Sequence, residues 1–240
     1  MNKTASFAYQ FYKWLIFIPF LGLTTLIFGA AAIALSFFSK RFAGKWCGML
    51  WARSNIYATP AQITVRGRGH LDALRAYVIV ANHQSLFDIF VVYGWLGMDL
   101  RWIMKKELRK VPVLGLACEK VGHIIVDRSN TEAALASINA AKENITGGTS
   151  IVFFPEGTRS RNGRLGAFKK GAFRLALDLG LPILPISISG TKNILPPDGL
   201  NLMPGRVTLT IHPPIDLSEY SIENLPELME RTRNAIESAL

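Results

Sequence analysis

The sequence predicts an α/β protein, with a mostly parallel mixed sheet flanked by helices and an N-terminal apolar helical membrane anchor. Two observations predict the sheet: short apolar, β-branched runs such as 77–81 and 150–154, and helical patterns that alternate with them. A third predicts the anchor: the 25 residues from Trp14 to Phe38 carry no charge. We therefore divide the chain into an anchoring segment, 1–45, and a catalytic domain, 46–240.

The apolar segment is long enough for a membrane, since a helix of this length would run about 37 Å. Pro19 and Gly22 interrupt it in its first third, and we expect them to break it into two helices. Basic residues flank both ends, which favours a hairpin lying in one leaflet over a single span, although both remain open. These flanking residues are Lys3, Lys13, Lys40, Arg41 and Lys45.

The remaining elements are predicted from hydrophobic periodicity and from residues that begin or end helices. A cap at Asn130 or Thr131 begins one helix and Gly147-Gly148 stops it, while Gly180 closes the next. Apart from the two runs above, strands are predicted at 61–66, 101–104, 123–126, 183–188 and 207–211, and helices at 86–96, 131–145, 168–179 and 225–239. Parallel sheets place their sites at the carboxyl ends of strands, so we expect His83 and Glu156, each two residues past a buried strand, to share one edge.

Composition points to an anionic partner. The 240 residues are 50% hydrophobic, their mean hydropathy is +0.24 and the formal net charge is +10. Such a field attracts phosphorylated molecules or an acidic lipid surface. Nucleic acid is disfavoured because the basic residues are scattered and no nucleic-acid-binding motif appears. Cys47 and Cys118 form neither a C-x-x-C pair nor a metal-ligand cluster, which indicates free thiols in a reducing compartment.

A histidine and an aspartate stand five positions apart, at His83 and Asp88. Ser85 is a good N-cap, and it places His83 in the turn before a helix and Asp88 in the first helical turn, where the two side chains can meet. In one interpretation Asp88 merely caps the helix. In the other, neutral His83 removes a proton from a hydroxyl while Asp88 fixes the tautomer of the ring. Without a G-x-S-x-G serine, the hydroxyl would be the substrate's own.

The segment from Phe154 to Ser160 predicts a rigid turn, because Pro155 and Gly157 directly follow a strand. Arg159 can grip a phosphate, and Glu156 can orient Arg159 or bind a substrate hydroxyl. A plain surface turn with a solvated ion pair is the alternative. Two lysine pairs, Lys105-Lys106 and Lys169-Lys170, are open to the same choice between a phosphate site and a solvated face.

These motifs resemble the 1-acylglycerol-3-phosphate acyltransferase family, the PlsC-type lysophosphatidic acid acyltransferases. From about Ala61 to His212 they follow the family's order: the H-x4-D box at Asn82–Asp88, Lys105–Leu108 with Pro112 and Gly115, Val126–Arg128, the Phe154–Ser160 box, and Leu184–Ile186. Several boxes in order over this length are specific, and none departs from the family's pattern.

The resemblance implies acyl transfer from acyl-CoA or acyl-carrier protein to the sn-2 hydroxyl of lysophosphatidic acid, which gives phosphatidic acid without an acyl-enzyme. His83 would be the base, Asp88 its orienter, and Lys105 or a backbone N–H the oxyanion donor. Substrate-binding residues would be Glu156, Gly157, Thr158, Arg159 and Lys106, with Arg159 on the phosphate. No metal and no cofactor besides the acyl thioester co-substrate is implied.

The same reasoning places the protein at an anionic membrane surface, with the catalytic domain on the cytoplasmic face of the inner membrane. The apolar segment would also open a path for the acyl chain. The oligomeric state is left open. Alternatives are a related acyltransferase for glycerol-3-phosphate, another lysophospholipid or a lyso-ornithine lipid; a membrane-bound thioesterase or hydrolase; and a non-catalytic peripheral membrane protein.

Overall fold

The centre of the molecule is a seven-stranded mixed sheet, with its strands in the order β1-β7-β6-β2-β5-β3-β4. This computed structural model describes residues 9–127, 131–142, 145, 148–161, 163–199 and 201–240. Five neighbouring strands, from β6 to β4, run parallel, while β7 pairs with β6 antiparallel and with β1 parallel. The strands are β1 (Ala61–Arg66), β2 (Val78–Ala81), β3 (Leu100–Lys105), β4 (Ile124–Val126), β5 (Ser150–Phe153), β6 (Ile183–Ser189) and β7 (Gly205–Ile211). The predicted fold class is confirmed.

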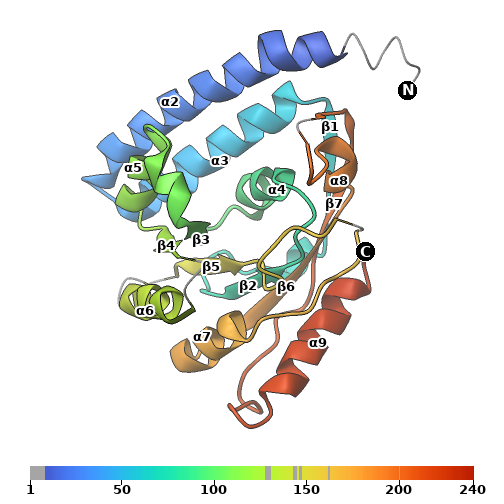
Figure 1. Cartoon of the computed structure of the whole chain (residues 1–240). Coiled ribbons are helices and arrows are strands. Elements are labelled where there is room, and N and C mark those ends of the chain that lie inside the picture. The colour runs from blue at the N-terminus through green and yellow to red at the C-terminus, as the bar shows by residue number, and fades with distance from the viewer. Residues whose placement is uncertain (1–8, 128–130, 143–144, 146–147, 162, 200) are drawn as a thin grey trace.

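Helices cover both faces of the sheet (Figure 1). One face carries α2 (Ile18–Ser36), α3 (Lys40–Ala58), α4 (Phe87–Leu96), α5 (Leu114–Lys120) and the short α8 (Thr191–Ile194), and the other carries α6 (Thr131–Ala141), α7 (Gly171–Leu179) and α9 (Leu225–Glu237). Side chains of each strand alternate between the faces: Ile79 packs in one apolar core, and Val78 and Val80 pack in the other. The central strands are buried on both faces, which explains their continuous apolar runs.

The N-terminal segment forms one long helix, contrary to the expected break at Pro19 and Gly22. Helical structure runs unbroken over 28 residues from Tyr9 to Ser36, with a π-helical turn, η1 (Lys13–Phe17), just before α2. Pro19 stands at the start of α2, where its missing N–H costs little because the wider turn precedes it. Residues 37–39 then connect α2 to α3, and these two helices pack together as the hairpin (Figure 1).

Several boundaries differ from those predicted. Helix α6 ends at Ala141 and not at 145, and its predicted cap Asn130 and stop residue Gly147 lie outside the described residues. Helix α7 begins at Gly171, so residues 168–170 belong to the preceding loop. Helices α3, α5 and α8 were not predicted, and α3 continues through residue 45, where the predicted anchor ends; that division of the chain stays a prediction.

Candidate active site

Two loops meet at the carboxyl ends of neighbouring parallel strands. Residues 82–88 follow β2 and residues 154–160 follow β5, and these strands pair directly in the sheet. The backbone joins the loops, since Ser160 donates its N–H to the carbonyl of His83 at 2.8 Å. The shared edge predicted for His83 and Glu156 is therefore observed.

The imidazole of His83 contacts the carboxylate of Asp88, with 2.8 Å between Nδ1 and Oδ2. The same Oδ2 accepts the backbone N–H groups of Gln84 and Ser85, at 2.7 and 2.9 Å. Because the buried carboxylate of Asp88 accepts a hydrogen bond from Nδ1–H, the lone pair of the ring lies on Nε2. The N-cap of α4 is Leu86 and not the predicted Ser85, but Ser85 Oγ accepts the N–H of Phe87, so a side-chain bond to the first turn and the dyad exist together.

Neighbouring side chains fix the position of the ring. Phe154 stacks on His83 with 3.9 Å between ring centroids and 9° between planes. Asn82, also buried, pairs with the backbone of Ile188 on β6 at both ends of its amide, at 2.8 and 2.7 Å. The loop that carries His83 is thereby held to two strands, β5 through Phe154 and β6 through Asn82.

Glu156 ties the second loop to the first. Its Oε1 accepts the backbone N–H of His83 at 2.9 Å, and its Oε2 accepts that of Gly166 at 2.8 Å. Gly157 follows with φ of 75°, a left-handed conformation that glycine adopts without strain. The side chain of Lys169 lies over Gly157, so that a Cβ there would stand 3.0 Å from its amine nitrogen. The positive φ disfavours a side chain at position 157, whereas the exposed end of Lys169 could move aside.

A cavity of about 890 Å³ opens in front of His83. Its polar wall includes Lys105, Thr158 and Arg159, and Gly157 also lines it. The rest is largely apolar and comes from helices α2 and α4, strand β3 and the loop after α8, through residues such as Phe17, Ile18, Leu21, Ile89, Phe90, Ile103, Met104 and Leu195. The arrangement brings a base, cations and an apolar chamber to one place, as a reaction on an anionic amphiphile requires.

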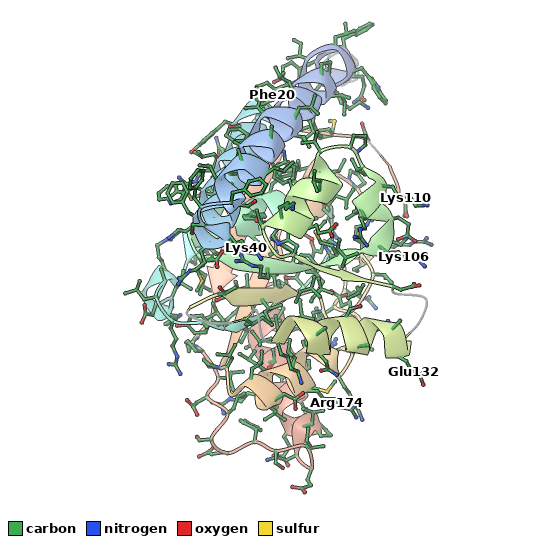
Figure 2. All side chains as sticks on the ribbon, turned by 90° about the vertical axis from the view of Figure 1, so that its left-hand side faces the viewer. Phe20, Lys40, Lys106, Lys110, Glu132 and Arg174 are labelled. Atoms are coloured by element: carbon green, nitrogen blue, oxygen red, sulfur yellow. The ribbon has the colours of Figure 1, made fainter. Side chains whose placement is uncertain are left out.

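Other predicted residues stand apart from the cavity. Asp88 lies behind His83, and Glu156 is engaged by the backbone. Lys106 forms an ion pair with Asp127, whose hydrogen bond raises the pKa of the lysine. Figure 2 shows Lys106 at the same edge of the molecule as Lys110. Arg128, part of the motif at 126–128, lies outside the described residues.

Lys13 departs from its expected place on the membrane-facing flank. It is only 5% exposed and lines the cavity, one turn before Phe17. The charge pattern gave no sign of this, because a flanking lysine and a cavity lysine look alike in the sequence. Its position adds a lysine side chain to the wall of the chamber.

A buried polar group that the sequence did not reveal forms the inner wall. The backbone N–H of Trp102 points to Nδ1 of His123 at 3.5 Å, and Nε2 of His123 lies 3.2 Å from the hydroxyl of Tyr93. Burial, and then the charge of Arg101, lower the pKa of His123 to about 3, so the ring is neutral. Burial also raises the pKa of the Cys118 thiol, which lines the same cavity, to about 12. Cys118 is therefore a thiol and a poor nucleophile.

Metal ligands do not gather in this region. Over the described ranges, no group of three or more His, Cys, Asp or Glu side chains is arranged to hold an ion. The chemistry that the site can perform thus starts from an oriented imidazole, several cations and an apolar chamber.

Comparison with known proteins identifies this class of site. The family model described as "Acyltransferase" matches residues 62–189, and the chain belongs to that family. It is 30% identical over 237 residues to a 1-acyl-sn-glycerol-3-phosphate acyltransferase of Chlamydomonas reinhardtii, a match covering 97% of this chain and 69% of the relative. A chloroplastic enzyme of the same name from Brassica napus is 34% identical, over 80% of this chain and 54% of its own length.

A solved structure extends the likeness to the whole fold. The crystal structure of the 1-acyl-sn-glycerophosphate acyltransferase PlsC from Thermotoga maritima matches with a TM-score of 0.83 and 27% identity, over 100% of this chain and 96% of that one. The predicted resemblance is confirmed: the chain is an acyltransferase of the 1-acylglycerol-3-phosphate group. Its apolar helix, long enough to cross a bilayer, agrees with membrane association.

Proposed function

We propose that the protein transfers a fatty acyl group from an acyl thioester, acyl-CoA or acyl-carrier protein, to the sn-2 hydroxyl of 1-acyl-sn-glycerol 3-phosphate, giving phosphatidic acid. The observation that carries this proposal is that His83, bonded to Asp88 behind it, faces a large apolar cavity that Arg159 also lines. The names of the relatives agree with it.

His83 would act as general base through Nε2. It takes the proton of the acceptor hydroxyl as that oxygen attacks the thioester carbonyl, and the carboxylate of Asp88 stabilises the imidazolium. The tetrahedral intermediate then expels the thiolate, which takes the proton back from His83. No acyl-enzyme forms, which fits the high pKa of the Cys118 thiol in the cavity wall.

The cations of the cavity would bind the acceptor phosphate and stabilise the oxyanion. Arg159 would hold the acceptor phosphate with its planar fork, next to Gly157 and Thr158. The oxyanion would be stabilised by Lys105, which lines the cavity, or by a backbone N–H. The apolar wall from α2 and α4 would take the acyl chains, which makes the anchor helix part of the chamber.

The helical hairpin would lie in one leaflet and place the site at the cytoplasmic membrane surface. Large apolar side chains remain exposed along η1, α2, the connection and α3, among them Leu15, Ile16, Leu23, Phe37, Phe38, Phe42 and Trp46. Lys40, Arg41 and Lys45 stand beside them, as is common for a helix at an anionic interface. Vesicle flotation tests this: Phe37→Asp with Phe38→Asp should weaken binding to anionic vesicles.

Product analysis tests the reaction. Purified protein is given one acyl-CoA and a panel of lysolipids, with and without acceptor. We expect an acceptor-dependent diacyl product with lysophosphatidic acid, and none from His83→Ala, which should still fold because its ring lies at the cavity wall. Free fatty acid released at the same rate without acceptor would instead identify a thioesterase.

A further inference from the structure

A second, basic groove lies beside the catalytic cavity. It has a volume of about 660 Å³ and is walled by the loop that connects β5 to α7, coloured from yellow to gold in Figure 1. Three cations line it: Arg161, Arg164 and Lys169. Thr158 and Arg161 line the groove and the cavity alike, so the two spaces adjoin.

Hydrogen bonds hold the wall of this basic groove. Ser160 Oγ accepts the N–H of Gly163 and donates to the carbonyl of Arg164, at 3.0 and 2.7 Å. Behind it, the guanidinium of Arg233 donates to the carbonyls of Leu165 and Gly166, at 2.9 and 2.6 Å. These bonds hold Arg164 and its neighbours from 163 to 166 to Ser160 and to Arg233.

The charge balance of the groove favours an anion. Among the described residues of its lining, Glu156 is the one acidic side chain, and both oxygens of that carboxylate already accept backbone N–H groups. Asp198, which lines the adjoining catalytic cavity, approaches Arg161 at 3.4 Å, but both side chains are mostly exposed and the pair is weak. A phosphate entering the groove would meet three positive side chains.

The second substrate, the acyl thioester donor, also carries a phosphate. Under the proposed function, the acceptor phosphate lies inside the cavity with Arg159. Acyl-CoA and acyl-carrier protein share a pantetheine chain, with the reacting thioester at one end and a phosphate at the other. We propose that the basic groove binds the phosphate-bearing end of the acyl thioester donor, while the thioester reaches His83 past Thr158. This inference rests on the proposed function and adds its donor subsite.

Steady-state kinetics with the full chain in detergent micelles test the proposal. The variant carries Arg164→Gln and Lys169→Gln together, and Arg161 is kept because it also lines the catalytic cavity. We expect its KM for acyl-CoA to rise by roughly tenfold or more, the loss expected for charge-assisted contacts at an exposed site. Its kcat and its KM for lysophosphatidic acid should stay within about twofold, because neither His83 nor Arg159 is changed.

A matched control is Arg174→Gln. Arg174 is an exposed arginine on α7 that lines neither space, and Figure 2 shows it on the other side of the sheet from α2. The Arg174→Gln substitution removes a positive charge from the same region and should leave the KM for acyl-CoA unchanged. Circular dichroism of each variant verifies the fold.

Different donors identify which phosphate is bound. Acyl-pantetheine, which has no phosphate, should show the same KM with the wild type and the double variant. If acyl-carrier protein and acyl-CoA are both affected, the groove holds the pantetheine phosphate; if acyl-CoA alone is affected, it holds the nucleotide phosphates. Adenosine 3′,5′-bisphosphate should compete with acyl-CoA in the wild type in the second case.

Two results would overturn the inference. One is a rise in KM for lysophosphatidic acid alone, which would make the groove an acceptor subsite. The other is an unchanged KM for every donor. Equilibrium dialysis of acyl-CoA distinguishes failure of the donor subsite from failure of the proposed function. If the wild type binds acyl-CoA through the groove but acylates no lysophosphatidic acid, the proposed reaction is refuted and the donor subsite is not.

Discussion

The carboxylate of Glu156 accepts the backbone N–H of His83 at 2.9 Å, although the two residues come from loops after different strands. Its second oxygen accepts the N–H of Gly166, on the wall of the basic groove. One side chain therefore sets the position of the base and the start of the groove together.

Replacing Glu156 by Gln should lower kcat and leave the KM for lysophosphatidic acid within about twofold. An amide oxygen can serve only one of the two N–H groups, and the amide NH₂ would oppose the other donor. A small shift of the base is enough to cost about tenfold or more. Steady-state kinetics separate this from the predicted substrate contact, in which the KM would rise instead.

Asp88→Asn should reduce kcat by roughly 10²- to 10⁴-fold while the thermal stability changes little. Asn remains a good cap for the N–H groups of Gln84 and Ser85, but it no longer offers a negative charge to the imidazolium of His83. Differential scanning fluorimetry and product formation are measured on the same sample. Equal activity of the variant and the wild type would leave Asp88 with the capping role alone.

Arg159→Lys should raise the KM for lysophosphatidic acid by roughly 10- to 100-fold, because a single ammonium cannot reproduce the planar fork on a phosphate. Monoacylglycerol, which lacks the phosphate, is the matched substrate, and its poor turnover should not change. The phosphate role fails if the KM for lysophosphatidic acid is the same in both proteins.

Asn82→Ala should lower the free energy of unfolding by about 2 kcal/mol or more, since it leaves a buried N–H and a buried carbonyl of Ile188 without partners. Asn193→Ala, at an exposed position of α8, is the control and should have little effect. Urea denaturation in detergent provides the comparison. Equal midpoints for the two variants would contradict the role of Asn82.

Acid should destabilise the protein through His123. Its pKa is about 3 when folded and near the ordinary 6.5 when unfolded, so between these values the unfolded chain binds the extra proton. The free energy of unfolding is therefore fully retained above pH 6.5 and decreases as the pH falls. At pH 5 the loss due to His123 is about 2 kcal/mol. His123→Asn should flatten the difference between unfolding midpoints at pH 7 and pH 5; an unchanged difference would exclude the effect.

The sequence predicted the sheet and the meeting of His83 with Glu156 because both depend on local rules. Buried parallel strands are continuous apolar runs, and their carboxyl ends share an edge. The pairing of His83 with Asp88 followed from helix geometry and the cap at Ser85.

Other features depend on tertiary contacts that leave no local pattern. Pro19 was expected to break the anchor, but the preceding π-helical turn at 13–17 accommodates it. The burial of Lys13, the wall formed by Tyr93 and His123, and the pairing of Lys106 with Asp127 join segments far apart in the chain. Spacing within one motif carries no information about such contacts.

The long helix at the start of the chain has two sides with different uses: Phe17, Ile18 and Leu21 enclose the chamber, while Leu15, Ile16 and Leu23 remain uncovered. A water-soluble version made by deleting this helix would therefore lose one wall of the cavity. Replacing only its exposed apolar residues by polar ones would keep the cavity closed, and is the design route that this architecture permits.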